Sequence, residues 1–251
     1  MADNQEKLQS TDIKLTSSNK FLKWLENFWY YHKWKVIVIA FFAVVLVVGV
    51  VQMVSKTDPD IEVTVATHTV YYKENVDALE QTLNSLMQED INGDGKRSVV
   101  LNTYKIYSEA ELKAANEKDT DAAGNPVIYA DEAHNKSQIE SYNSYIMTGQ
   151  CSVMIISEYL YHDLTSRGSD EILLTPISEI YGENLPAGVT ADGYGIRLRD
   201  TGAYKSLDAF RSLPQDSIIC IMRPFVMNGN RGAEKHEAAV EYFKTIVEFG
   251  N

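Results

Sequence analysis

The chain has few cysteines and prolines, and it lacks the short motifs of common catalytic sites. Its 251 residues include two cysteines and six prolines. The absence of G-x-S-x-G, of H-E-x-x-H and of a phosphate-binding glycine loop argues against the usual serine-hydrolase, zinc-peptidase and nucleotide sites. No heptad seam or internal repeat indicates a rod or a repeat array. We therefore assign no catalytic residue and expect a domain that binds a ligand or a partner.

The two cysteines, Cys151 and Cys220, lie in the apolar runs CSVMII and IICIM. A buried free thiol behaves as a small hydrophobic side chain, and we favour this interpretation. A disulfide is the alternative if the two runs are neighbouring strands. No cysteine lies directly after the apolar run near the N-terminus, which argues against a bacterial lipoprotein anchor.

Positive charge is scarce outside the N-terminal segment. The chain carries 23 Lys and Arg against 35 Asp and Glu, a net charge of -12. Residues 1–56 hold seven lysines and four acids, which leaves -15 for residues 57–251. Such an acidic domain repels nucleic acid and anionic lipid head groups. We expect no nucleic-acid partner, and a cationic or neutral partner instead.

The longest apolar run covers residues 36–54, VIVIAFFAVVLVVGVVQMV, and contains no charge. A helix of that length covers about 28 Å, close to the roughly 30 Å hydrocarbon core of a bilayer. A buried core helix would seldom be apolar on every face, and a cleaved signal peptide would have a shorter run and a small-residue cleavage site. The run therefore predicts a transmembrane helix that contacts membrane lipid.

The placement of lysine predicts the orientation of this span. Four lysines precede it: Lys20, Lys23, Lys33 and Lys35. Three acids follow it closely: Asp58, Asp60 and Glu62. Because Lys and Arg are enriched on the cytoplasmic side, we expect a single-pass protein of the cell membrane with an extracellular C-terminal domain. Residues 1–20 would then be a flexible cytoplasmic tail.

All three tryptophans, Trp24, Trp29 and Trp34, lie in the lysine-rich segment of residues 21–35. Tryptophan rings favour the head-group region of a membrane. The segment therefore predicts an interfacial helix that anchors the span. The alternative is that it recruits a cytoplasmic or membrane partner.

Beyond a linker of residues 55–60, residues 61–251 alternate between strand-like and helix-like stretches. This pattern is typical of an α/β fold with helices on a largely parallel sheet, and we expect one three-layer α/β domain. The predicted strands cover residues 61–70, 98–107, 151–157, 193–200 and 217–225. The predicted helices cover residues 74–90, 137–149, 158–167 and 233–249.

Residues 108–134 are polar and predict a mobile excursion from this domain. The helix after it is expected to begin with a capping box formed by Ser137 and Glu140.

The run Asp90-Ile-Asn92-Gly-Asp94-Gly-Lys96 matches the first half of an EF-hand calcium loop. Side-chain oxygens at alternate positions and the carbonyl of Lys96 would surround one ion. The twelfth position is Leu101 where the loop needs a glutamate. We favour an ordinary helix-to-strand turn, with a weakly bound calcium ion as the alternative. No other cofactor is expected.

Ligands of open α/β sheets usually bind at the carboxyl ends of the strands. In the predicted strand assignment, six residues with polar side chains lie at or directly after the carboxyl ends of strands and become candidate ligand-binding residues: His68, Tyr71, Tyr107, Ser157, Glu158 and Arg223.

Residues 138–180 resemble the middle of type 2 extracellular solute-binding proteins. A helix ending near Gly149, a strand from Cys151 to Ser157 and a leucine-rich connection to Ile177 occur in the order of that family. The resemblance implies a fold like one lobe of such a protein. The N-terminal arrangement is similar to uncharacterised membrane-anchored proteins of clostridial-type bacteria.

These observations favour a membrane-tethered extracytoplasmic binding or interaction module whose partner is a small solute or an envelope protein. A surface hydrolase or transferase is an alternative, with Glu158 and Asp131 as a carboxylate pair that only the fold could assemble. A structural subunit of a membrane complex is another.

Overall fold

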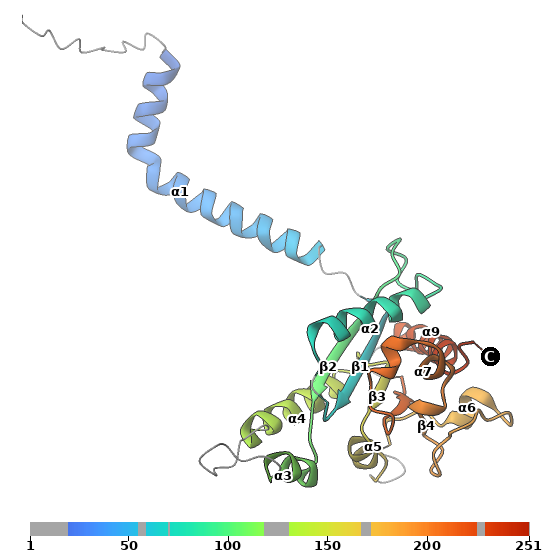
Figure 1. Cartoon of the computed structure of the whole chain (residues 1–251). Helices are drawn as coiled ribbons and strands as arrows, with labels where there is room; N and C mark the ends of the chain where they lie inside the picture. The colour runs from blue at the N-terminus through green and yellow to red at the C-terminus, as the bar shows by residue number, and fades with distance from the viewer. Residues whose placement is uncertain are drawn as a thin grey trace, which may run out of the picture. The chain divides into compact units, whose positions relative to one another are not determined.

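The computed structural model consists of two compact units, residues 1–57 and 58–251. It describes residues 20–54, 59–69, 71–117, 131–166, 172–224 and 229–250 (Figure 1). Residues 1–19 of the predicted tail and most of the predicted linker therefore lie outside the described residues.

One uninterrupted helix, α1 (Lys20–Val54), covers both the predicted interfacial segment and the predicted span. Within it, residues Trp24–Val51 form a stretch of 28 residues that is long and apolar enough to cross a membrane, and none of its most apolar window is buried. The side chains of Trp24, Trp29 and Trp34 are all exposed. The described residues thus include one N-terminal helix of the kind expected in a single-pass or signal-anchored membrane protein.

The second unit is built on a five-stranded sheet of order β2-β1-β3-β5-β4. Its strands are β1 (Ile61–Thr67), β2 (Val99–Lys105), β3 (Val153–Ile156), β4 (Gly195–Arg197) and β5 (Ile218–Ile221). β1 pairs in parallel with β2 and β3, whereas β5 runs antiparallel to both β3 and β4. The prediction of a largely parallel sheet is therefore wrong for β5.

Helices cover both faces of this sheet (Figure 1). Since side chains alternate along a strand, Val63 and Val65 of β1 face one layer while Ala66 faces the other. The first layer contains α2 (Lys73–Leu86), α6 (Ile177–Tyr181), α7 (Gly202–Ser206), α8 (Asp208–Arg211) and α9 (Gly229–Val247). The second contains α4 (Glu132–Met147) and α5 (Glu158–Thr165).

The predicted polar excursion is partly helical. α3 (Glu109–Glu117) begins with a capping box in which Ser108 and Glu111 exchange hydrogen bonds of 2.8 and 3.2 Å. The predicted capping box at Ser137 is wrong, because α4 begins earlier, where Asp131 accepts hydrogen bonds from the N–H groups of Ala133 and His134. Residues 118–130 of the excursion lie outside the described residues.

Both cysteines are free thiols in the buried core, in agreement with the favoured interpretation. The Cys151 sulfur lies 3.2 Å from the hydroxyl oxygen of Thr64. Burial raises the pKa of the Cys151 thiol to about 12, against the smaller lowering effect of the Thr64 hydrogen bond. The thiol therefore stays protonated at neutral pH.

Candidate functional site

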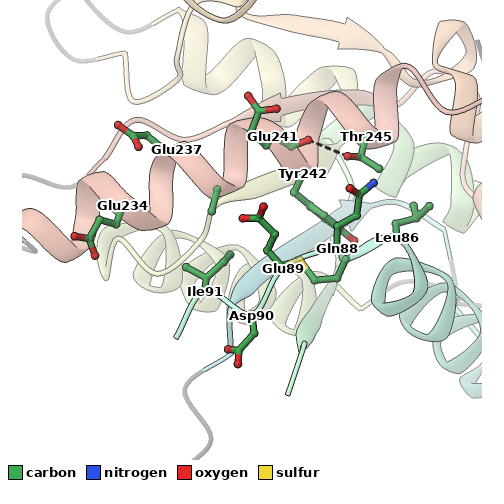
Figure 2. A pocket seen from close by; sticks show the side chains of 12 residues that line it. Leu86, Gln88, Glu89, Asp90, Ile91, Glu234, Glu237, Glu241, Tyr242 and Thr245 are labelled. Atoms are coloured by element: carbon green, nitrogen blue, oxygen red, sulfur yellow. Dashed lines mark hydrogen bonds between the residues drawn. The ribbon is translucent and has the colours of Figure 1, made fainter. Parts of the chain in front are cut away.

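A groove of about 570 Å³ lies between α9 and the segment that follows α2 (Figure 2). Five of its twelve lining residues are acids: Glu89, Asp90, Glu234, Glu237 and Glu241. Its apolar and aromatic lining consists mainly of Leu86, Met87, Ile91 and Tyr242. We call this concavity the acidic groove. Its volume falls within the range of small-molecule sites, roughly 300–1,000 Å³.

The acids of α9 share one side of the helix because they are spaced three and four residues apart. Glu234, Glu237 and Glu241 follow one another along α9 in Figure 2. The opposite side of the helix is apolar, and there Phe243 and Ile246 are fully buried against the sheet. Burial of the apolar stripe therefore presents the row of glutamates to the groove.

Tyr242 connects the two walls of the acidic groove. Its side chain is 4% exposed, and its hydroxyl donates a 2.8 Å hydrogen bond to the carbonyl of Leu83 in α2. Burial raises the pKa of Tyr242, so the phenol remains a neutral donor at neutral pH. The bond fixes α9 beside the end of α2, where the opposite wall begins.

The opposite wall is held by Asp60, which lies just before β1 and is 1% exposed. Its carboxylate accepts hydrogen bonds from the backbone N–H groups of Ile91, Asn92 and Ser98, at 2.8, 2.9 and 2.8 Å. A carboxylate that accepts several N–H bonds is stabilised as an anion without a cationic partner. Asp60 therefore fixes the segment that carries Glu89 and Asp90.

Among the described residues, few basic side chains form ion pairs with the carboxylates of the acidic groove. Glu241 forms an ion pair of 2.8 Å with Lys244, and Asp90 accepts hydrogen bonds from Gly93 and Gly95. Among the residues that the structure describes, none forms an ion pair with Glu89, Glu234 or Glu237. Three carboxylates at this concavity are thus available to a cationic ligand.

The predicted calcium loop forms a turn whose acceptor groups bind its own backbone. Asp90 accepts bonds from Gly93 and Gly95, Asn92 from the N–H of Asp94, and Asp94 from the N–H of Lys96, the last two at 2.8 Å. Gly95 has a φ of 83°, which suits glycine. Over the described ranges, no group of three or more His, Cys, Asp or Glu is arranged to hold a metal ion. The geometry is that of turn chemistry, and calcium binding remains a prediction.

Five of the six predicted strand-end residues lie at the end of the sheet where the parallel strands β1, β2 and β3 meet their following loops. The His68 imidazole lies 3.1 Å from the Glu111 carboxylate and its ring centroid lies 6.5 Å from that of Tyr107. Tyr71 hydrogen-bonds to the Thr67 hydroxyl, and burial raises the pKa of Tyr71 to about 12. The contacts of His68 and Tyr71 are thus made with other residues of the same domain.

Ser157 and Glu158 begin α5 at the same end of the sheet. Ser157 is buried and caps the helix by accepting a hydrogen bond from the N–H of Leu160. Asp131, the other acid considered for a catalytic pair with Glu158, is occupied as the cap of α4. The side-chain oxygens of Ser157 and Asp131 therefore accept hydrogen bonds from backbone N–H groups at the N-termini of α5 and α4.

Arg223 does not join the other predicted residues. It follows β5, which runs antiparallel to β3. Arg223 therefore lies near the start of β3, whereas Ser157 lies just after its end. Its Nε donates a 3.0 Å hydrogen bond to the carbonyl of Leu174, and its guanidinium lies 3.9 Å from Glu179. Because β5 is antiparallel to β3, the structure does not bring Arg223 together with the other five candidate residues, whose role in binding a ligand remains a prediction.

The acidic groove was not predicted from the sequence. The spacing of Glu234, Glu237 and Glu241 was a usable signal for one wall. The other wall depends on hydrogen bonds to Asp60 from residues far along the chain, which no local pattern indicates. Comparison with models of protein families, with curated proteins and with solved structures found no match.

Proposed function

We propose that this chain is a membrane-tethered binding module whose acidic groove takes a small solute with more than one ammonium group, such as a linear polyamine. The observation that carries the proposal is a concavity of small-molecule size lined by three glutamates that form no ion pair with any described residue. Ammonium groups would bind the carboxylates. The methylene chain between them would contact Met87, Ile91 and the ring of Tyr242.

The tether is α1, the helix suited to crossing a membrane. We propose a cytoplasmic N-terminus, supported by the four lysines ahead of the span, and an extracellular domain at the cell membrane. Protease added to intact cells should then digest residues 58–251 and leave α1 in the membrane. Full protection of the domain until lysis would reverse the proposed orientation.

The finer prediction of a solute-binding lobe belongs to the same proposal. A five-stranded sheet with helices on both faces is the architecture that the resemblance implies for one lobe. A single lobe encloses its ligand on one side only, which suits an open groove.

The test is calorimetric titration of the full chain in phosphatidylcholine discs with spermidine. Neutral lipid is needed because anionic lipid would bind the polyamine by itself. We expect binding that weakens as salt rises, since exposed charges are screened. The triple variant Glu89→Gln, Glu234→Gln, Glu237→Gln should lose about tenfold in affinity, from about 0.5 kcal/mol for each exposed pair.

The matched control is Glu140→Gln, an exposed acid on α4, which covers the other face of the sheet. It should bind spermidine as the unmodified chain does. Octane-1,8-diol, a neutral chain of similar length, should give no heat. Equal affinity of the triple variant and the control variant would contradict the proposal.

A further inference from the structure

A different surface, the free edge of β2, has a backbone pattern suited to a second ligand. β2 is the terminal strand of the five-stranded sheet, and β1 is its sole partner among the strands that the structure describes. The Ile106 N–H donates to Thr67 in β1, and the Ser98 carbonyl accepts from Asp60 just before β1. Backbone groups alternate in direction along a strand, so those of residues 99, 101, 103, 105 and 107 point away from the sheet.

Two asparagine side chains occupy the ends of this outer edge. Asn84 of α2 accepts from the N–H of Val99 at 2.8 Å and donates to its carbonyl at 3.1 Å. Asn135 of α4 accepts from the N–H of Tyr107 at 2.9 Å and donates to its carbonyl at 3.0 Å. Each amide satisfies both backbone groups of one residue, as a neighbouring strand would. The asparagines therefore limit the free edge to the residues between them.

The outward N–H and C=O groups of Leu101, Thr103 and Lys105 have no hydrogen-bond partner among the described residues. Unpaired edge groups of this kind are a template for an added strand. We propose that this edge, between Asn84 and Asn135, is a docking site for a short extended segment of a partner protein. The backbone would bind through up to six hydrogen bonds, two at each open residue.

A second copy of β2 fits this edge poorly. Antiparallel pairing around a two-fold axis would place Thr103 opposite its own counterpart, since Val99 and Tyr107 lie four residues to either side. Val99 would then face Tyr107 of the second copy, with Asn84 and the second copy's Asn135 both in the gap. Paired strands are only about 4.8 Å apart, which leaves no room for two side-chain amides. A slim peptide whose ends diverge from the edge avoids this clash.

Side chains beside the edge indicate the character of that segment. Val100 is 38% exposed on the α4 side, and the partly buried Tyr104 lies on the same side. Lys105, on the α2 side, extends its amine over the ring of Tyr107, 5.0 Å from the ring centroid. We expect a segment with a β-branched or aromatic residue against Val100 and an acid near Lys105.

Amide hydrogen exchange of the full chain in lipid discs tests the open edge directly. The N–H groups of Leu101, Thr103 and Lys105 should exchange rapidly. Those of Val99 and Tyr107, which the asparagines occupy, should be protected. Protection of all five amides in the free protein would overturn the proposal, because it would show that the edge is already covered.

Binding is tested with displayed random twelve-residue peptides selected on the full chain in discs. Selected peptides should protect the amides of Leu101, Thr103 and Lys105, and Thr103→Pro should abolish their binding. Because the Thr103 N–H points outward, proline removes no bond of the β1–β2 ladder and is tolerated at an edge. Thr103→Val keeps the N–H and is the matched control, which should bind normally.

Modified peptides provide a test that does not depend on whether Thr103→Pro folds. N-methylation of alternate peptide amides should abolish binding in one register and have little effect in the other, with the protein unchanged. Peptides that bind Thr103→Pro and the unmodified chain equally, or that protect the acidic groove instead, would overturn the proposal. So would a selection without any edge-dependent peptide, or a dimer that Thr103→Pro dissolves.

Discussion

α1 and α9 are both long helices rich in apolar side chains, but they place those side chains in opposite environments. Ile39 and Leu46 of α1 are more than 60% exposed, whereas Phe243 and Ile246 of α9 are fully buried in the sheet core. Residues 36–54 of α1 are apolar around the whole circumference of the helix, and α9 has an apolar stripe beside a row of glutamates. α1 is therefore long and apolar enough to cross a membrane, whereas α9 is stabilised by packing within its own domain.

The largest expected effect comes from truncation of the α9 stripe. Phe243→Ala should lower the free energy of unfolding of the domain by about 3–5 kcal/mol, because it removes a buried ring and leaves a cavity. Phe41→Ala makes the same truncation in α1 and should leave that energy unchanged. Chemical denaturation in lipid discs, followed by tyrosine near-UV circular dichroism, measures both. Equal effects of the two variants would contradict the proposed difference in environment between the apolar side chains of α1 and α9.

A charge in the middle of α1 tests the lipid environment. Leu46→Lys should disfavour membrane insertion by about 2.5–3.5 kcal/mol. The measurement is the fraction of chain that remains in the membrane pellet after carbonate extraction, with Leu46→Phe as the control. Unfolding of the domain should be unaffected. An unchanged pellet fraction would contradict the assignment of α1 as a span.

Loss of the buried carboxylate at Asp60 should have an intermediate effect. Asp60→Ala leaves the N–H groups of Ile91, Asn92 and Ser98 without their acceptor, and should lower the free energy of unfolding by about 1–3 kcal/mol. Spermidine affinity should fall as well, because one wall of the acidic groove is released. Asp94→Ala, which removes one local turn bond, is the control. Hydrogen exchange at Ile91 that stays slow in Asp60→Ala would show that the wall has another support.

Near neutral pH the smallest effect is the start of an alkaline loss of stability. The pKa values of Cys151 and Tyr71 are raised to about 12 in the folded chain, chiefly by burial. The unfolded chain loses these protons at lower pH, so stability should fall as pH rises from about 9 towards 12. Cys151→Ala should show a shallower slope in denaturation experiments across that range. An identical slope would mean that the thiol ionises equally in both states.

The sequence predicted most strands and the long helices because their patterns are local. The apolar alternation of β1 and the helical spacing of α2 and α9 each arise within one segment. Helices α7 and α8 were missed because four or five residues are too few to show a period.

The direction of β5 could not be predicted from its own residues. The run Ile218–Ile221 is apolar at every position and buried on both faces. Its pattern therefore does not distinguish a parallel from an antiparallel strand. The antiparallel pairing moved Arg223 away from the predicted site. The acidic groove depends in the same way on contacts between distant segments, since Asp60 binds residues 91–98.

The attachment of the domain to its tether has a mechanical consequence. After α1 the chain enters the sheet at β1, which lies between two strands that run in the same direction. A pull on the chain at the start of β1, when it acts along the strand direction, loads the hydrogen bonds of β1 to β2 and β3 in shear, many at once. Strands loaded in this way resist force better than strands that unzip one bond at a time.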